Sequence, residues 1–257
     1  MPETHSTKRN WTAESVRFTA FPTGPLELSS ATEWWHSIIG RAPEALTVRQ
    51  GAAVEAVGPI DRGNLGLVFS AFGELRLDLI LSPPVPVKPE FQSLGEAKDA
   101  VEALSDVVEK WFQLGIPTRR LALGGVVHSD AASVTDGYNG LSELLPAVKL
   151  DSEGSSEFLY QINRPRPSHT AEVAINRLSK WAVAARHHLT FSFALSGQAT
   201  VPGSMALATP SAMSIRLEFD INTSPTHTGA FSPDVLEPLL RELVTLAEEV
   251  WSKGDRP

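Results

Sequence analysis

Apolar and polar positions follow the same order in two stretches of the chain, which begin at residues 75 and 215. In both, apolar side chains stand at every second position, along 75–81 and along 215–221. A period of two is typical of a strand with one buried face and one more polar face. A loop that contains proline follows each stretch, and proline cannot continue a central ladder. The pattern therefore predicts two matching strands that each end at such a loop.

A long amphipathic helix is predicted after each of these strands. Apolar residues recur at spacings of three and four along 97–111 and again along 236–250, the pattern of a helix with one buried face. Ser93 and Glu96 have the spacing of a capping box before the first helix. Ser232 is a candidate N-cap for the second. We expect each helix to pack on the strands that precede it.

An ungapped alignment of 75–111 with 215–251 also brings identical residues together. Agreement of order, length and period favours an internal duplication over chance. We therefore predict an α+β fold with two related halves, each an antiparallel sheet in the order strand, helix, three strands, packed on a long C-terminal helix. The identical pairs are Arg76 with Arg216, Leu77 with Leu217, Phe91 with Phe231, Glu102 with Glu242, Glu109 with Glu249, and Trp111 with Trp251.

The remaining elements are expected in the same order in both halves. A first strand is predicted at 16–21 and at 158–162. A short helix follows, around Trp34 and Trp35 in the first half and around Ile175, Leu178 and Trp181 in the second. The further strands are predicted at 46–57 and 65–72, and at 189–201 and 205–208.

The predicted boundaries are a flexible polar leader at 1–12, a first half at 13–150 and a second half at 151–257. The connection between the halves holds a strand candidate at 121–128 and a short helix near 141–145. Gly124 and Gly125 inside that strand suggest either a β-bulge or a close backbone approach.

Composition narrows the classes of function. The chain has 257 residues and no cysteine, which excludes disulfides, thiol nucleophiles and thiolate zinc sites. No apolar run is long enough for a membrane span, so we expect no membrane partner. The lack of cysteine fits a cytoplasmic protein, and this is the location we expect. A net charge of −8 disfavours a general nucleic-acid binder, which needs an excess of Lys and Arg.

Short motifs give the chain a resemblance to a known family. Residues 118–124 read Thr-Arg-Arg-Leu-Ala-Leu-Gly after a long helix, and residues 217–222 form an acidic strand end before a final helix that Trp251 closes. In these features the chain resembles a sporadically distributed, functionally uncharacterised family of bacterial proteins. The resemblance implies a bacterial origin and carries over no functional residue. Each half also resembles a helix-grip or TATA-binding-protein-like unit, which is a likeness of fold and does not fix a function.

The most acidic candidate site lies on the second alternating strand. Glu218 and Asp220 are two residues apart, so they share one face of the sheet. They could bind a hard cation or act as an acid–base pair. The alternative is an ordinary solvated face that Arg216 balances.

Other chemical signatures are missing from the sequence. The histidines lack the spacing that places two metal ligands on one helical face. His128 could contribute to a site only with partners from distant parts of the chain. There is no Gly-x-Ser-x-Gly elbow and no phosphate-binding loop. We therefore expect no catalytic residue, no metal site and no cofactor, and we keep a metal-dependent enzyme built on Glu218 and Asp220 as an alternative.

Contact residues are predicted in a basic stretch at 163–188 and at two tryptophans. The basic side chains could meet a phosphate backbone, an acidic partner or a second subunit, or could be ordinary surface charge. Trp34 and Trp35 are adjacent, so a helix cannot bury both on one narrow stripe, and an exposed tryptophan would anchor a contact. The basic residues concerned are Arg164, Arg166, Arg177, Lys180 and Arg186.

These patterns lead to one principal hypothesis of function. We expect a non-enzymatic protein-interaction or scaffold component of a bacterial multi-component system, of the defence or toxin–antitoxin type, that binds a protein partner or a second copy of itself. The alternative is a domain that binds a small molecule or a nucleic acid through a grip-type sheet and the basic stretch.

Overall fold

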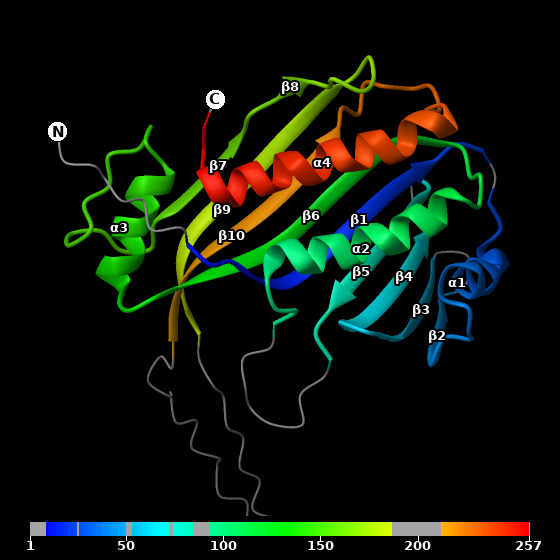
Figure 1. Cartoon of the computed structure of the whole chain (residues 1–257), viewed down its shortest axis with the longest axis horizontal. Coiled ribbons are helices and arrows are strands. Elements are labelled where there is room, and N and C mark those ends of the chain that lie inside the picture. Colours follow the sequence, from blue (N-terminus) through cyan, green and yellow to red (C-terminus); the bar gives the residue numbers. More distant parts are fainter. Residues whose placement is uncertain are drawn as a thin grey trace, which may run out of the picture.

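The computed structural model describes residues 9–24, 26–49, 53–71, 74–84, 93–186 and 212–256. Within these residues the fold is α+β, as predicted, with one ten-stranded antiparallel sheet and four α-helices (Figure 1). The first part of the chain forms β1 (Thr12–Pro22), the short 3-10 helix Leu28–Ser30, α1 (Ala31–Ile39), β2 (Ala45–Arg49), β3 (Ala53–Ile60), β4 (Gly63–Ser70), β5 (Arg76–Ser82) and α2 (Ala97–Phe112). The second part forms β6 (Thr118–Ala131), α3 (Val134–Leu144), β7 (Leu159–Asn163), β8 (Arg166–Pro167), β9 (Ala174–Arg186), β10 (Ala212–Thr223) and α4 (Pro233–Lys253).

The sheet continues without a break through both parts of the chain. Its strand order is β2-β3-β4-β5-β1-β6-β10-β9-β7, and β8 also pairs with β9. β1 and β6 lie side by side at the centre, with Phe18 opposite Leu123. Their pairing joins residues that are more than 100 positions apart, such as Thr12 and His128.

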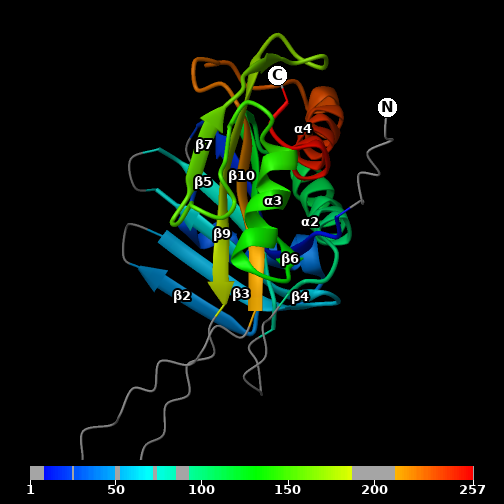
Figure 2. The same ribbon diagram turned by 90° about the vertical axis from the view of Figure 1, so that its left-hand side faces the viewer.

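All four helices lie on one face of the sheet. α2 packs on β1 and β5, α4 packs on β10 and β6, and the two helices contact each other. Figure 2 shows α2, α3 and α4 on the same side of the strands. α1 covers β3 and β4, and α3 covers β10 and β9.

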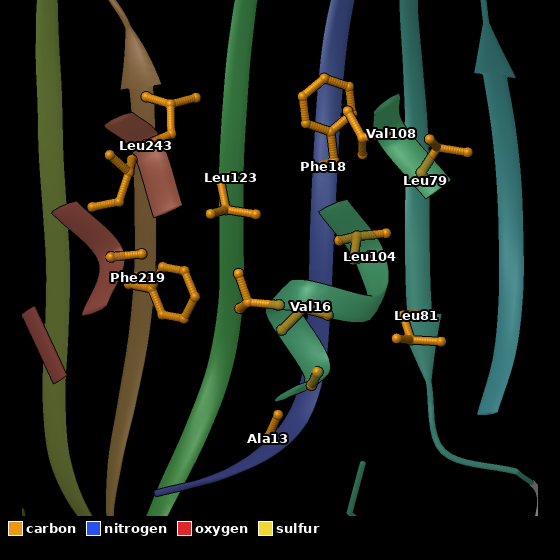
Figure 3. Close-up of a cluster of buried hydrophobic side chains, with 14 of the residues drawn as sticks. Ala13, Val16, Phe18, Leu79, Leu81, Leu104, Val108, Leu123, Phe219 and Leu243 are labelled. Atoms are coloured by element: carbon orange, nitrogen blue, oxygen red, sulfur yellow. The ribbon is translucent and has the colours of Figure 1, made fainter. Parts of the chain in front are cut away.

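The core fills the space between the sheet and the two long helices. Phe18, Leu79 and Leu123 are at most 1% exposed, and they point toward Leu104 of α2 and Leu243 of α4 (Figure 3). The alternating pattern along β5 and β10 therefore puts its apolar set under the helices, as a period of two requires. Burial of this apolar surface is the main force that holds the layers together.

The start of α2 differs from the predicted capping box. The helix begins at Ala97, and neither Ser93 nor Glu96 caps it through its side chain. The backbone N–H of Ala97 instead donates to the carbonyl of Trp11. Trp11 was predicted to belong to the flexible leader, yet it is 7% exposed and contacts Trp181 edge-on. Trp11, just ahead of β1, therefore satisfies a backbone N–H at the start of α2 in place of the predicted capping box of Ser93 and Glu96.

The short helix predicted around Ile175, Leu178 and Trp181 is wrong. These residues lie in strand β9. Ile175 and Trp181 are six positions apart, so they share the buried face of a strand, and Leu178 points the other way. A spacing of three suits a helix, but the even separation of the two most buried residues also suits a strand.

The glycine pair in β6 permits a close backbone approach and makes no bulge. The pairing of β6 with β1 and with β10 passes Gly124 and Gly125 without a shift in register. A Cβ atom on Gly125 would lie 2.9 Å from the ring of Phe219 and from the carbonyl oxygen of Ser15. The helix expected near 141–145 is α3, which is longer than predicted and begins at Val134, where Ser133 caps it by accepting from the N–H of Asp136.

The strands expected at 16–21, 65–72 and 158–162 agree with β1, β4 and β7, and the helix carrying Trp34 and Trp35 is α1. The single strand expected at 46–57 is wrong, because this stretch forms the two antiparallel strands β2 and β3. Four strands therefore follow α1 in the first part of the chain, where three were predicted. The strands predicted at 189–201 and 205–208 lie outside the described residues, as do residues 1–8 of the leader. Among the described helices, none combines the length and apolarity needed to cross a membrane.

Candidate interaction face

The sheet has an open face, which we define as the side that points away from the four helices. No described helix covers it, and its side chains come from the positions that alternate with the core. On the central strands it includes Ser15, Arg17, Thr19, Arg76, Asp78, Ile80, Gly124, Val126, His128, Leu178, Lys180, Arg216, Glu218 and Asp220.

A hollow of about 520 Å³ lies in the middle of the open face. Strands β5, β1, β6, β10, β9 and β7 all contribute to its lining. Its walls combine apolar side chains, among them Ile80, Val126 and Leu178, with the charged groups of Arg17 and Lys180. Such a mixture of apolar surface and a few placed polar groups is common to ligand and partner sites.

Arg17 reaches across the sheet at the floor of this hollow. Its Nη2 lies 3.5 Å from Oδ2 of Asp220, although β6 separates their strands. The residue between them is Gly124, which pairs with Arg17 on one side and with Asp220 on the other. A Cβ atom on Gly124 would lie 3.6 Å from Nη2 of Arg17 and 3.1 Å from the carbonyl oxygen of Phe219. The absence of a side chain at Gly124 therefore opens the path that the Arg17 side chain takes.

Among the residues that the structure describes, the guanidinium of Arg17 makes only long ion-pair contacts. Its nearest carboxylate oxygens, on Asp220 and Asp78, are 3.5 Å and 3.9 Å away, which is too far for a good hydrogen bond. Asp78 is already matched, because Arg76 lies 2.7 Å from it and the Thr19 hydroxyl donates to it at 2.6 Å. Arg17 is 39% exposed at its side chain, so an incoming acceptor can reach its donors.

Glu218 and Asp220 share the open face, as the alternation predicted. Glu218 is paired with Arg216 and with Lys180, whose Nζ lies 3.2 Å away. Burial opposes the charge on Glu218, but the hydrogen bonds from Arg216 and Lys180 outweigh it and lower the pKa of this carboxyl. Asp220 accepts from the side-chain amide of Asn222 at 2.8 Å. Both carboxylates are thus matched by donors of the chain itself.

His128 contacts two residues from distant parts of the chain, Ser214 and Glu14. Its Nδ1 lies 3.1 Å from Oγ of Ser214, and its Nε2 lies 2.5 Å from Oε2 of Glu14. Glu14 occupies the register shift between Ala13 and Ser15, and this bulge turns its side chain toward His128. The order serine, histidine, carboxylate resembles a hydrolase triad. Ser214 is fully buried, however, so the hydroxyl cannot meet a substrate and the group ties three strands together.

The basic residues predicted as one contact surface fall on both faces of the sheet. Lys180 lies on the open face beside Glu218. Arg164 and Arg166 bind Asp255 and Glu249 near the end of α4. Arg177 is 3% exposed and lies on the helix side near the same carboxylates, where burial lowers the pKa of its guanidinium. The side chain of Arg186 is outside the described part of the chain.

The cluster around Asp255 fastens the C-terminal end of α4 to the second part of the sheet. Nε and Nη2 of Arg164 each donate to the Asp255 carboxylate at 2.9 Å, and the Tyr160 hydroxyl donates to it at 2.7 Å. The Arg164 guanidinium holds the pKa of this buried carboxyl below its usual range. Bidentate pairing of this kind is strong and directional, so these arginines have a structural role.

The two predicted tryptophan contacts belong to the inner layer. Trp35 is 1% exposed, and Trp34 is partly buried with its ring edge-on to Phe69 at 5.2 Å between centroids. α1 packs on β3 and β4, so Trp35 is buried and Trp34 is partly buried against these strands. Neither tryptophan lies on the open face.

The chain matches no protein-family model and no curated protein.

Arg17 is the site residue that sequence reasoning missed. It stands at a polar position of an alternating strand, so its side of the sheet could have been read from the sequence. Its proximity to Asp78 and Asp220 could not, because the pairing of the central strands joins residues that are distant in sequence. No group of three or more potential metal ligands occurs among the residues that the structure describes.

Proposed function

We propose that the protein is a non-enzymatic interaction module that binds a protein partner on its open face. The observation that carries this proposal is the placement of all described helices on the other side of the sheet. A large sheet face that no described helix covers leaves its half-buried apolar side chains, such as Ile80 and Leu178, available to a second molecule. An apolar centre with a polar surround is typical of protein interfaces.

The charges on the open face favour a protein over a nucleic acid. Arg76, Arg216 and Lys180 each lie beside a carboxylate of a neighbouring position. Phosphate backbones require an excess of unmatched cations, which these pairs do not supply. Arg17 is the proposed anchor, since its donors suit a carboxylate or a backbone carbonyl of a partner, and arginine is frequent at interface hot spots.

A photo-crosslinking side chain at Leu178 tests the proposal in cells of the native host. The matched control carries the same group at Glu102, an exposed position of α2 on the helix side. We expect discrete protein adducts from Leu178, none of the same mass from Glu102, and loss of the adducts when Ile80→Arg is added. Equal labelling from both positions, or no adduct from Leu178, would overturn the proposal.

A second candidate function is the binding of a small molecule in the same hollow. The volume of about 520 Å³ and its mixed lining are of the size and character that small ligands use. Native mass spectrometry of protein purified without denaturation would find a bound mass that Leu178→Trp displaces. If the mass spectrum shows no bound ligand while Leu178 still gives partner adducts, the small-molecule function is rejected and only the protein-binding function is supported.

We also propose that the two parts of the chain are duplicated halves of the TATA-binding-protein-like type. Support comes from the sheet order, in which β5 and β10 flank the central pair β1-β6 symmetrically. On the open face, Arg76 pairs with Asp78 and Arg216 pairs with Glu218, at positions that the offset of 140 residues relates. The pairing favours a boundary between α2 and β6 over the predicted one at 150–151. Superposition of β5–α2 on β10–α4 in a crystal structure tests the proposal, and unrelated helix angles would refute it.

Packing on the helix side supports the same proposal. Trp111 of α2 contacts Phe18 of β1, and Trp251 of α4 contacts Phe219 of β10. The two tryptophans correspond, but the phenylalanine stands on the central strand in one half and on its neighbour in the other. Gly125 leaves the room for Phe219. In each half a phenylalanine thus fills the space beside the tryptophan of the long helix, from β1 in the first half and from β10 in the second.

A further inference from the structure

The two edges of the sheet are protected to very different degrees. One edge is β2, which pairs only with β3 among the described strands and whose residues are all exposed. The other edge is formed by β7 and β8 along β9, and it is interrupted by Pro165 and Pro167. Proline and breaks are the usual means by which proteins block further strand addition. β2 has neither of these features, and its sequence Ala-Leu-Thr-Val-Arg contains no lysine.

β2 also presents apolar side chains to solvent. Leu46 is 48% and Val48 is 61% exposed. They lie opposite Ala56 and Val54 of β3, so they extend the buried helix-side surface of the sheet beyond α1, which packs on β3 and β4. Of the four large apolar side chains that are exposed in the described part, two therefore stand on this single short strand.

We propose that β2 is a self-association edge, at which two copies of the chain pair their β2 strands antiparallel about a two-fold axis at Thr47. In this register Leu46 of one copy lies opposite Val48 of the other, and both apolar pairs fall on the helix side. Ala45 lies opposite Arg49, whose aliphatic stem covers it. The strand is therefore complementary to itself, which is what an interface with two-fold symmetry requires.

The choice of a second copy over a foreign strand rests on this self-complementarity. An isologous pairing satisfies the outward backbone groups of both edges at once and makes a continuous sheet across the two copies. A contact of five residues per copy is small, so the dimer is weak and its population depends on concentration. The inference is independent of the proposed partner on the open face.

The absence of cysteine makes a direct test possible. Thr47→Cys places a single thiol on the proposed axis, where opposed Cα atoms stand about 4.5–5.5 Å apart, within reach of a disulfide. Ala45→Cys is the matched control, since it lies on the same strand and the same face but about 13 Å from its own copy in this register. We expect mild oxidation to give a covalent dimer rapidly from Thr47→Cys and slowly from Ala45→Cys. Equal rates for the two variants would overturn the register.

Sedimentation of the unmodified chain gives the second readout. We expect the weight-average mass to rise with concentration toward that of a dimer, and Val48→Lys to hold it at the monomer. Leu159→Lys, which places the same charge on the opposite edge, should leave the rise unchanged. A monomer at every concentration, or equal loss in both variants, would refute the proposal. Because Val48 is exposed, circular dichroism of Val48→Lys should match the parent chain.

Discussion

The guanidinium of Arg17 in β1 lies 3.5 Å from the carboxylate of Asp220 in β10, and strand β6 runs between them. Gly124 is the only residue of β6 that both of them face, and it provides the space for this contact. The lack of a side chain at Gly124 therefore determines how Arg17 lies at the centre of the open face. Substitutions at this glycine should act on the site and on the fold together.

Gly124→Val should destabilise the fold by about 1–2 kcal/mol, because a branched side chain would displace Arg17 and crowd the carbonyl of Phe219. Gly66→Val is the control, since Gly66 also lies in the sheet but a Cβ there would meet no atom closer than 3.9 Å. The control should be neutral or stabilising by about 0.5–1 kcal/mol, because glycine in a strand is entropically costly. Urea unfolding measures both, and a smaller cost at Gly124 than at Gly66 would contradict the account.

Gly125→Ala should cost about 1–3 kcal/mol, since its methyl group would lie 2.9 Å from the Phe219 ring. Phe219→Leu removes that ring and makes the residue the same as Leu79, its counterpart at the offset of 140 residues. The double variant should be more stable than the sum of the two single changes implies, because the added methyl group fills part of the vacated space. A double-mutant cycle by thermal or urea unfolding gives this coupling, and strict additivity would contradict it.

Asp255→Asn should lower the free energy of unfolding by about 2–4 kcal/mol at neutral pH, because it leaves Arg164 with a weaker acceptor and places an uncharged amide among buried donors. Asp130→Asn, at an exposed position of β6, is the matched control and should change little. An equal effect of both changes would argue against a stabilising role for the C-terminal cluster.

The same pair of variants predicts a pH dependence. The pKa of Asp255 is lowered in the folded chain from its ordinary value of 3.8, so its contribution is complete above that value and is lost as pH falls through the folded pKa. The stability difference between the parent and Asp255→Asn should therefore shrink in acid. Unfolding curves from neutral pH downward test this, and a difference that grows as pH falls has the wrong sign.

Arg17→Met should change stability by less than about 1 kcal/mol, since its ion pairs are long and partly exposed. It should nevertheless reduce the yield of partner adducts from Leu178 severalfold, because the anchor donors are gone. Comparison of adduct yield with unfolding free energy separates the two effects. An unchanged adduct yield would show that Arg17 does not contribute to the interface, but it would not contradict partner binding on the open face.

Local pattern predicted those elements whose burial follows a single period. The alternation at 75–81 gave β5, and the spacing along 97–111 gave α2. The prediction around Ile175, Leu178 and Trp181 failed because their spacing of three suits a helix, whereas the even separation of Ile175 and Trp181 suits one face of a strand. The partners of Arg17 and His128 depend on which distant strands become neighbours, and neither hydropathy nor spacing carries that information.

The Asp255 cluster shows the same limit in another form. Arg164, Arg166, Arg177 and Lys180 form a basic run in sequence, and the run suggested one contact surface. A strand turns successive side chains to opposite faces, so the run is divided in space, and carboxylates from the end of α4 meet the inward part. Charge clustering along a chain is informative only after the secondary structure is known.

The central position of β1 has a consequence for how the chain folds. This strand is bonded on one side to β5 and on the other to β6, so each part of the chain supplies the innermost neighbour of the other. Loss of either part would expose an unpaired strand in the middle of the sheet rather than at its rim. We therefore expect a single cooperative unfolding transition with coincident spectroscopic probes, and slow folding, because the pairings that close the sheet are remote in sequence.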